Sequence, residues 1–152
     1  MDQSLIQILL VFHDVLATAL LLLISWQVLV AFLPSLAAKT GQRESGPALR
    51  DVLCVLLIVT IGLGSALYPT YRFAVRPYLE SNGLHDANGA FEIKEQFAAL
   101  AIVMLPAYRA AWDRATFSTT LIARRVITGL LCAAVWWNFA VGHLMNSIKA
   151  LS

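Results

Sequence analysis

Apolar residues are gathered into four long runs along the chain, and most of the charged residues lie between these runs or close to their ends. The runs cover residues 4–33, 52–68, 91–112 and 120–148. A helix that crosses the hydrocarbon of a bilayer needs about 20 predominantly apolar residues. The pattern therefore predicts an all-α integral membrane protein, an up-and-down four-helix bundle that forms a single transmembrane domain over residues 1–152.

Local signals suggest where the helices end and how they pack. Pro34 and Pro69 are expected to end the first and second helices, because proline cannot continue the helical hydrogen-bond ladder. Residues 76–90, with two Asn-Gly pairs, are expected to form a long outer loop. Gly62 and Ala66 form a small-xxx-small pair in the second helix, and we expect it to pack against another helix.

The composition agrees with a membrane protein and argues against a nucleic-acid partner. The chain has 152 residues, of which 59% are hydrophobic and 13% are charged, far from the balance of a soluble domain. Its formal net charge is only +2 and it has no dense basic patch, so no nucleic-acid partner is expected. Cys54 and Cys132 stand alone in apolar runs, which favours buried apolar packing over a disulfide.

The basic residues predict the orientation in the membrane. Seven lie in or near the two connections on one side: Lys39, Arg43, Arg50, Arg109, Arg114, Arg124 and Arg125. Four lie on the other side: Arg72, Arg76, Lys94 and Lys149. The positive-inside rule places the first group in the cytoplasm. We therefore expect a protein of the bacterial inner membrane with both termini on the outer, periplasmic side.

Two histidines lie inside the first and last apolar runs at similar depths. His13 and His143 are each roughly nine residues, or about 14 Å, from the outer end of their helix. Ionisable groups are costly in hydrocarbon and usually face the bundle interior or a cofactor. Ala17 and Gly142 leave room beside them, whereas Asp14 lies about 100° around the helix from His13 and is expected to lean outward.

This arrangement suggests a small b-type cytochrome. Two neutral imidazoles can hold the iron of one haem b between them, and Arg72, Arg76 and Lys94 are cations suited to its propionates. The pattern resembles the four-helix cytochrome b anchors of respiratory complexes in architecture alone. On this interpretation His13 and His143 ligate the haem iron, and the chain transfers electrons as a subunit beside other membrane-protein subunits.

Charged residues lie at the start of the third predicted helix, on the same side of the membrane as the histidines. Glu92 and Glu95 share one helix face by their i, i+3 spacing, with Lys94 beside them. Isolated charges at this depth are costly. We therefore expect Glu92 or Glu95 to lie within reach of Arg72, Arg76 or a buried histidine.

Two other functions remain open from the sequence. The first is an accessory membrane subunit without a cofactor, in which the histidines only form hydrogen bonds within the bundle or to a partner. The second is a membrane metal-site enzyme that uses His13, Glu92, Glu95 and His143, as some helix bundles do. No Glu-x-x-His pair occurs within one helix, which makes the metal enzyme the weaker alternative.

Overall fold

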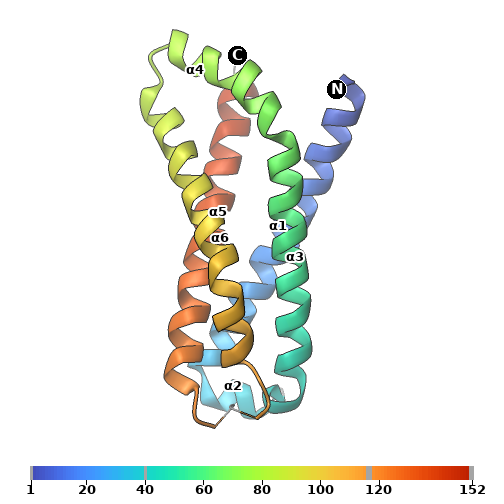
Figure 1. The fold of residues 1–152 in the computed structure, drawn as a ribbon, viewed down its shortest axis with the longest axis vertical. Coiled ribbons are helices and arrows are strands. Elements are labelled where there is room, and N and C mark those ends of the chain that lie inside the picture. The colour runs from blue at the N-terminus through green and yellow to red at the C-terminus, as the bar shows by residue number, and fades with distance from the viewer. Residues whose placement is uncertain (1, 40, 116–117, 151–152) are drawn as a thin grey trace.

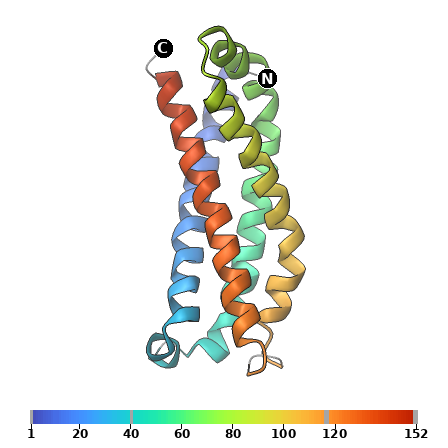
Figure 2. The same cartoon turned by 90° about the vertical axis from the view of Figure 1, so that its left-hand side faces the viewer.

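Four long helices lie side by side in the structure. The computed structural model describes residues 2–39, 41–115 and 118–150, and within them all regular structure is helical. The long helices are α1 (Gln3–Phe32), α3 (Gln42–Thr70), α5 (His85–Ala111) and α6 (Leu121–Ala150). They run alternately up and down, with both termini at one end of the molecule (Figures 1 and 2). The side chains of Arg43 and Lys149 lie outside the described part.

The helices close into a ring. Helix α1 packs against α3 and α6, and α5 packs against the same two helices. The first and last helices are therefore neighbours, as Figure 2 also shows. Residues from opposite ends of the chain can contribute to one site.

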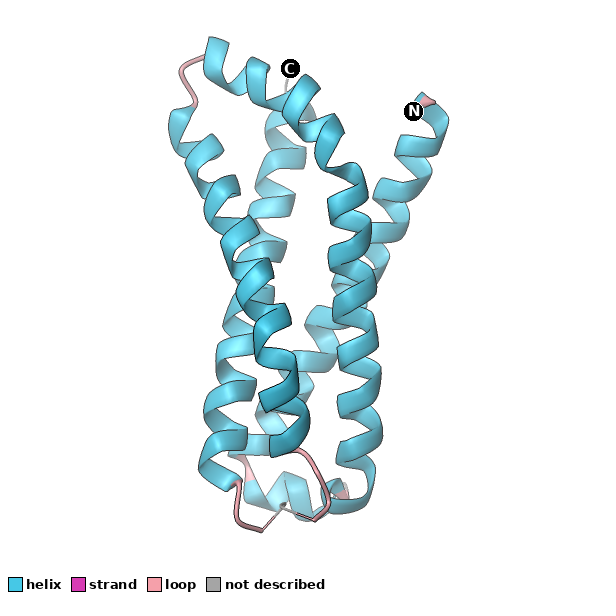
Figure 3. Cartoon of the chain, in the orientation of Figure 1, coloured by secondary structure: helices cyan, strands magenta, loops and turns pink. Residues whose placement is uncertain are grey.

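The chain is helical over more of its length than we expected (Figure 3). As predicted, α1 ends at Phe32, just before Pro34, which begins the short helix α2 (Pro34–Lys39). The prediction that Pro69 ends the second helix is wrong. After α3 the chain continues through a π-helical segment, η1 (Tyr71–Val75), into α4 (Arg76–Ser81).

The π-helical segment lies between two prolines, Pro69 and Pro77. Proline removes one backbone donor and crowds the preceding turn, yet the α-helix continues through Pro69 to Thr70, and the π-helical segment begins at Tyr71. The expected loop at 76–90 is consequently reduced to residues 82–84, with α4 before it and the first turn of α5 after it.

The larger of the two buried core clusters lies in the half of the bundle away from the termini. Helix α1 contributes its buried residues from Leu20 onward and has none before that position. The largest buried side chains in this half include Trp112, whose indole nitrogen donates to Thr128 Oγ1 at 3.0 Å. This end of the bundle is therefore tightly packed, whereas the helices diverge toward the termini (Figure 1).

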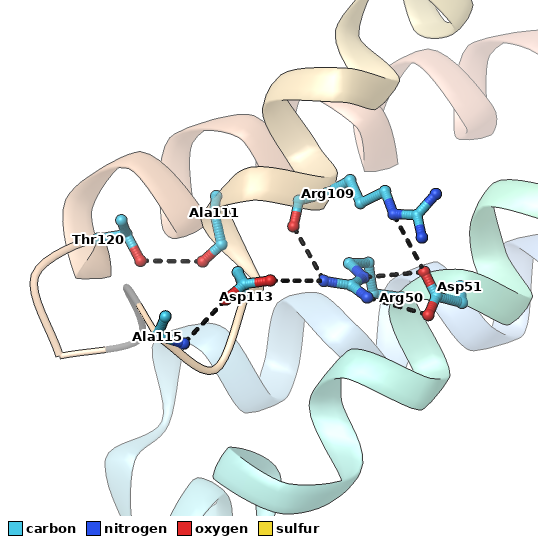
Figure 4. A network of polar contacts seen from close by, with 7 residues as sticks. All are labelled: Arg50, Asp51, Arg109, Ala111, Asp113, Ala115 and Thr120. Atoms are coloured by element: carbon cyan, nitrogen blue, oxygen red, sulfur yellow. Dashed lines mark hydrogen bonds and ion pairs between the residues drawn. The ribbon is translucent and has the colours of Figure 1, made fainter.

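A polar network ties α3 to the end of α5 at the packed end (Figure 4). The Arg50 side chain, 8% exposed, forms two hydrogen bonds to the Asp51 carboxylate and one to the Arg109 backbone carbonyl at 3.1 Å. Asp113 Oδ2 lies 3.9 Å from Arg50 Nη1, and Arg109 Nε lies 3.5 Å from Asp51 Oδ1. These contacts hold the loop after α5 against α3.

Three helical stretches are long and apolar enough to cross a membrane: Gln3–Phe32, Gly46–Ser81 and Leu121–Met145. Helix α5 is not among them, because Glu92, Lys94 and Glu95 on one side and Arg109 on the other shorten its apolar centre.

The packing prediction for Gly62 and Ala66 is wrong within the described chain. Both residues are exposed, and a Cβ placed on Gly62 would meet nothing within 4 Å. The pair therefore faces outward from the bundle.

Candidate functional site

A cavity of about 600 Å³ lies in the half of the bundle toward the termini, and all four long helices line it. Its walls are mostly apolar, and its volume is within the range of cofactor sites. The polar lining residues are His13, Asp14, Thr60, Ser65, Tyr68, Thr70, Tyr71, Lys94, Glu95, Asn138 and His143. The cavity exists because the helices diverge here and α1 buries no side chain before Leu20.

His13 reaches from α1 to the neighbouring wall of α3. A Cβ placed on Gly64 would lie 3.3 Å from His13 Cε1, so the imidazole packs against bare backbone at this glycine. Its Nδ1 is buried and has no hydrogen-bond partner among the described residues. Buried polar groups are normally paired, and this nitrogen instead faces the α3 backbone, 3.9 Å from the position of a Cβ on Gly64.

Thr60 adds a second unpaired polar group on the same wall. It is 7% exposed, lines the cavity, and its Oγ1 has no partner in the described part of the chain. A hydroxyl without a partner costs about 1–3 kcal/mol when buried. Thr60 was not expected at the site from the sequence, in which its only signal is a hydroxyl within an apolar run.

His143 enters the same cavity from α6. Its ring meets the Phe139 ring edge-on, with centroids 4.4 Å apart and an interplanar angle of 66°. The residue remains exposed on the cavity side of the helix. The structure thus brings the two histidines predicted from the sequence to one cavity, which Ala17 and Gly142 also line.

Asp14 lines the cavity together with His13 and is partly buried. The expectation that it would lean outward is wrong. Its side chain leaves the helix about 100° from that of His13, but the cavity is wide enough for both side chains to line it.

Lys94 brings a cation into the cavity from α5. Its Nζ lies 3.6 Å from the position that a Cβ on Gly142 would take, and 5.1 Å from the centroid of the Phe91 ring. Among the described residues, no carboxylate forms an ion pair with this nitrogen. The glycine lets the ammonium group lie against the backbone of α6.

The other expected cations lie outside the cavity lining. Arg76 Nε donates to Glu80 at 2.7 Å, and Arg76 Nη1 lies 3.7 Å from Glu92. Arg72 is exposed. Arg76 and Glu92 therefore connect α4 to α5, while Lys94 and Glu95 line the cavity.

Aromatic packing secures α5 against the π-helical segment at the same end. The rings of Tyr71 and Phe91 stack with centroids 3.5 Å apart, and the Tyr71 hydroxyl donates to Asn88 at 2.8 Å. Leu79 of α4 is fully buried beneath them with Val141. The segment after Pro69 thus packs against α5 and α6 and covers part of the cavity.

The set of residues suggested for a metal enzyme is not brought together. No group of three or more His, Cys, Asp or Glu side chains within residues 2–39, 41–115 and 118–150 is placed to hold a metal ion. Comparison of the chain with known protein families, with curated proteins and with solved structures finds no match.

Proposed function

We propose that all four long helices cross the bilayer, with the termini on the periplasmic side of a bacterial inner membrane. Helix α5 has 27 residues and is about 40 Å long, enough to span. It packs between two apolar helices, and its charged residues Lys94 and Glu95 line the cavity, which lowers the cost of placing them in the membrane. The basic residues of the α5–α6 connection support this orientation.

We further propose that the protein is a b-type cytochrome that carries one haem b between His13 and His143. One observation carries this proposal: histidines from the first and last helices line a single, mostly apolar cavity of about 600 Å³. Haem irons in membrane bundles take axial imidazoles from facing helices. The apolar walls would exclude water from such a group.

The residues around the cavity fit this ligand. His13 has a buried nitrogen without a partner, and the absence of a side chain at Gly64 and Gly142 lets the His13 imidazole and the Lys94 ammonium lie close to the helix backbone. A bound haem would supply reversible one-electron transfer. The protein would hold the group at a fixed depth and relay electrons between partner subunits of a larger membrane complex.

The absorption spectrum of the haem-loaded protein in detergent tests the proposal. We expect the wild type to show the low-spin spectrum of a haem with two axial ligands, and His13→Ala and His143→Ala each to lose it. His85→Ala is the matched control, because His85 is exposed at the start of α5 and does not line the cavity.

A folded wild-type protein that shows no haem spectrum after incubation with haem would rule out the cytochrome. An accessory membrane subunit without a cofactor would then be the remaining interpretation. Loss of the spectrum in His85→Ala as well would instead indicate that the spectrum comes from haem bound elsewhere.

A further inference from the structure

The ammonium group of Lys94 is a positive charge in a mostly apolar cavity. Asp14 and Glu95 line the same cavity, yet neither forms an ion pair with Lys94. Its described close contacts are the Phe91 ring and the bare backbone at Gly142. An ionisable group at such a depth normally has a partner, so the missing partner is expected to be a bound group.

The surroundings favour a carboxylate as that group. Charge-assisted hydrogen bonds from an ammonium to a carboxylate are among the stronger polar contacts, and they strengthen in a site of low dielectric constant. Thr60 adds a hydroxyl, itself more than nine-tenths buried and without a partner, on the neighbouring helix α3. The remaining walls are mostly apolar and suit the body of an amphiphile.

We propose that Lys94 binds a carboxylate of an amphiphilic ligand whose apolar body fills the cavity. The inference rests on the proposed function insofar as a haem propionate would supply this carboxylate. A fatty acid carries the same chemistry, and the experiment separates the two sources. Lys94, rather than Arg72 or Arg76, is the anchor, because the two arginines do not line the cavity.

Binding of metal-free protoporphyrin IX tests this anchor without iron ligation. Fluorescence titration of the full-length protein in detergent compares the free dicarboxylic acid with its dimethyl ester. We expect the wild type to bind the acid about 10- to 100-fold more tightly than the ester, the range for a hydrogen bond between charged groups. Lys94→Met should abolish this preference, and Lys94→Arg should retain most of it.

Lys39→Met is the matched control, since Lys39 is exposed at the opposite end of the bundle. His13→Ala and His143→Ala should lose the low-spin haem spectrum but keep the preference for the acid over the ester. Palmitate that displaces the porphyrin from the wild type, and does so more weakly from Lys94→Met, would identify a fatty acid as a second source of the carboxylate.

Three results would overturn the inference: equal wild-type affinities for acid and ester, a preference that persists in Lys94→Met, or no binding of either porphyrin and no binding of palmitate. If the preference for the acid holds but the wild type forms no low-spin haem, the carboxylate anchor stands and the cytochrome does not. The two proposals can therefore fail separately.

Discussion

Substitution of Gly64 by alanine tests the position of His13 most finely. The new Cβ would lie 3.3 Å from His13 Cε1, tighter than most contacts of a real Cβ atom. The imidazole must then move by a few tenths of an ångström or the two helices must separate. A fixed axial ligand tolerates little displacement, so we expect weaker haem binding.

The size of the effect follows from two opposing contributions. Replacing glycine by alanine within a helix stabilises it by about 1 kcal/mol. Overpacking of a filled contact costs about 1–3 kcal/mol. Gly64→Ala should thus range from neutral to about 2 kcal/mol less stable than the wild type. Gly62→Ala should be more stable by about 1 kcal/mol, because its Cβ would meet nothing within 4 Å.

The assay combines thermal unfolding in detergent with haem titration of both variants and the wild type. The two glycines lie on the same helix two residues apart, so they share sequence context and differ in what they face. Equal unfolding temperatures and equal haem affinities for Gly62→Ala and Gly64→Ala would refute the placement of His13 against α3.

Three further predictions concern topology and the packed end of the bundle. In a cysteine-free background, Gln3→Cys should react with an impermeant thiol reagent added from the periplasmic side, and Ser118→Cys should be protected; the reverse pattern would invert the orientation. Thr128→Val should destabilise the protein by about 1–3 kcal/mol by leaving the buried Trp112 indole without its acceptor, and Thr128→Ser should unfold near the wild-type temperature. Arg50→Met should cost about 1.5–3 kcal/mol through lost charged hydrogen bonds; an unchanged unfolding temperature would show that the network in Figure 4 contributes nothing to stability.

Much of the helical arrangement was predictable from the apolar runs. Their lengths gave four long helices, and Pro34 marked the end of α1. The meeting of His13 and His143 at one cavity was also predictable, since an even number of antiparallel helices returns the chain to its starting side at matched depth. Neither inference depends on how any helix is rotated about its axis.

Features that depend on helix rotation and local backbone adjustment were not predictable. Gly62 and Gly64 are equally small in the sequence, yet only Gly64 faces a neighbouring side chain. Asp14 was expected to lean outward because it lies about 100° around the helix from His13. It lines the cavity because the helices diverge, and the extent of that divergence is not encoded in the apolar runs. The helix beyond Pro69 continues through a π-helical segment, which depends on tertiary packing of residues such as Tyr71 against Phe91.

Electron paramagnetic resonance of the oxidised, haem-loaded protein would show whether His13 and His143 ligate the iron, because the ferric signal reports the axial ligands themselves. We expect one low-spin ferric signal of a haem with two imidazole ligands in the wild type. His13→Ala and His143→Ala should each convert it to a signal of a haem with one imidazole, while His85→Ala leaves it unchanged. A wild-type signal that is high-spin, or identical in all four proteins, would contradict the assignment of His13 and His143 as the ligands of one haem.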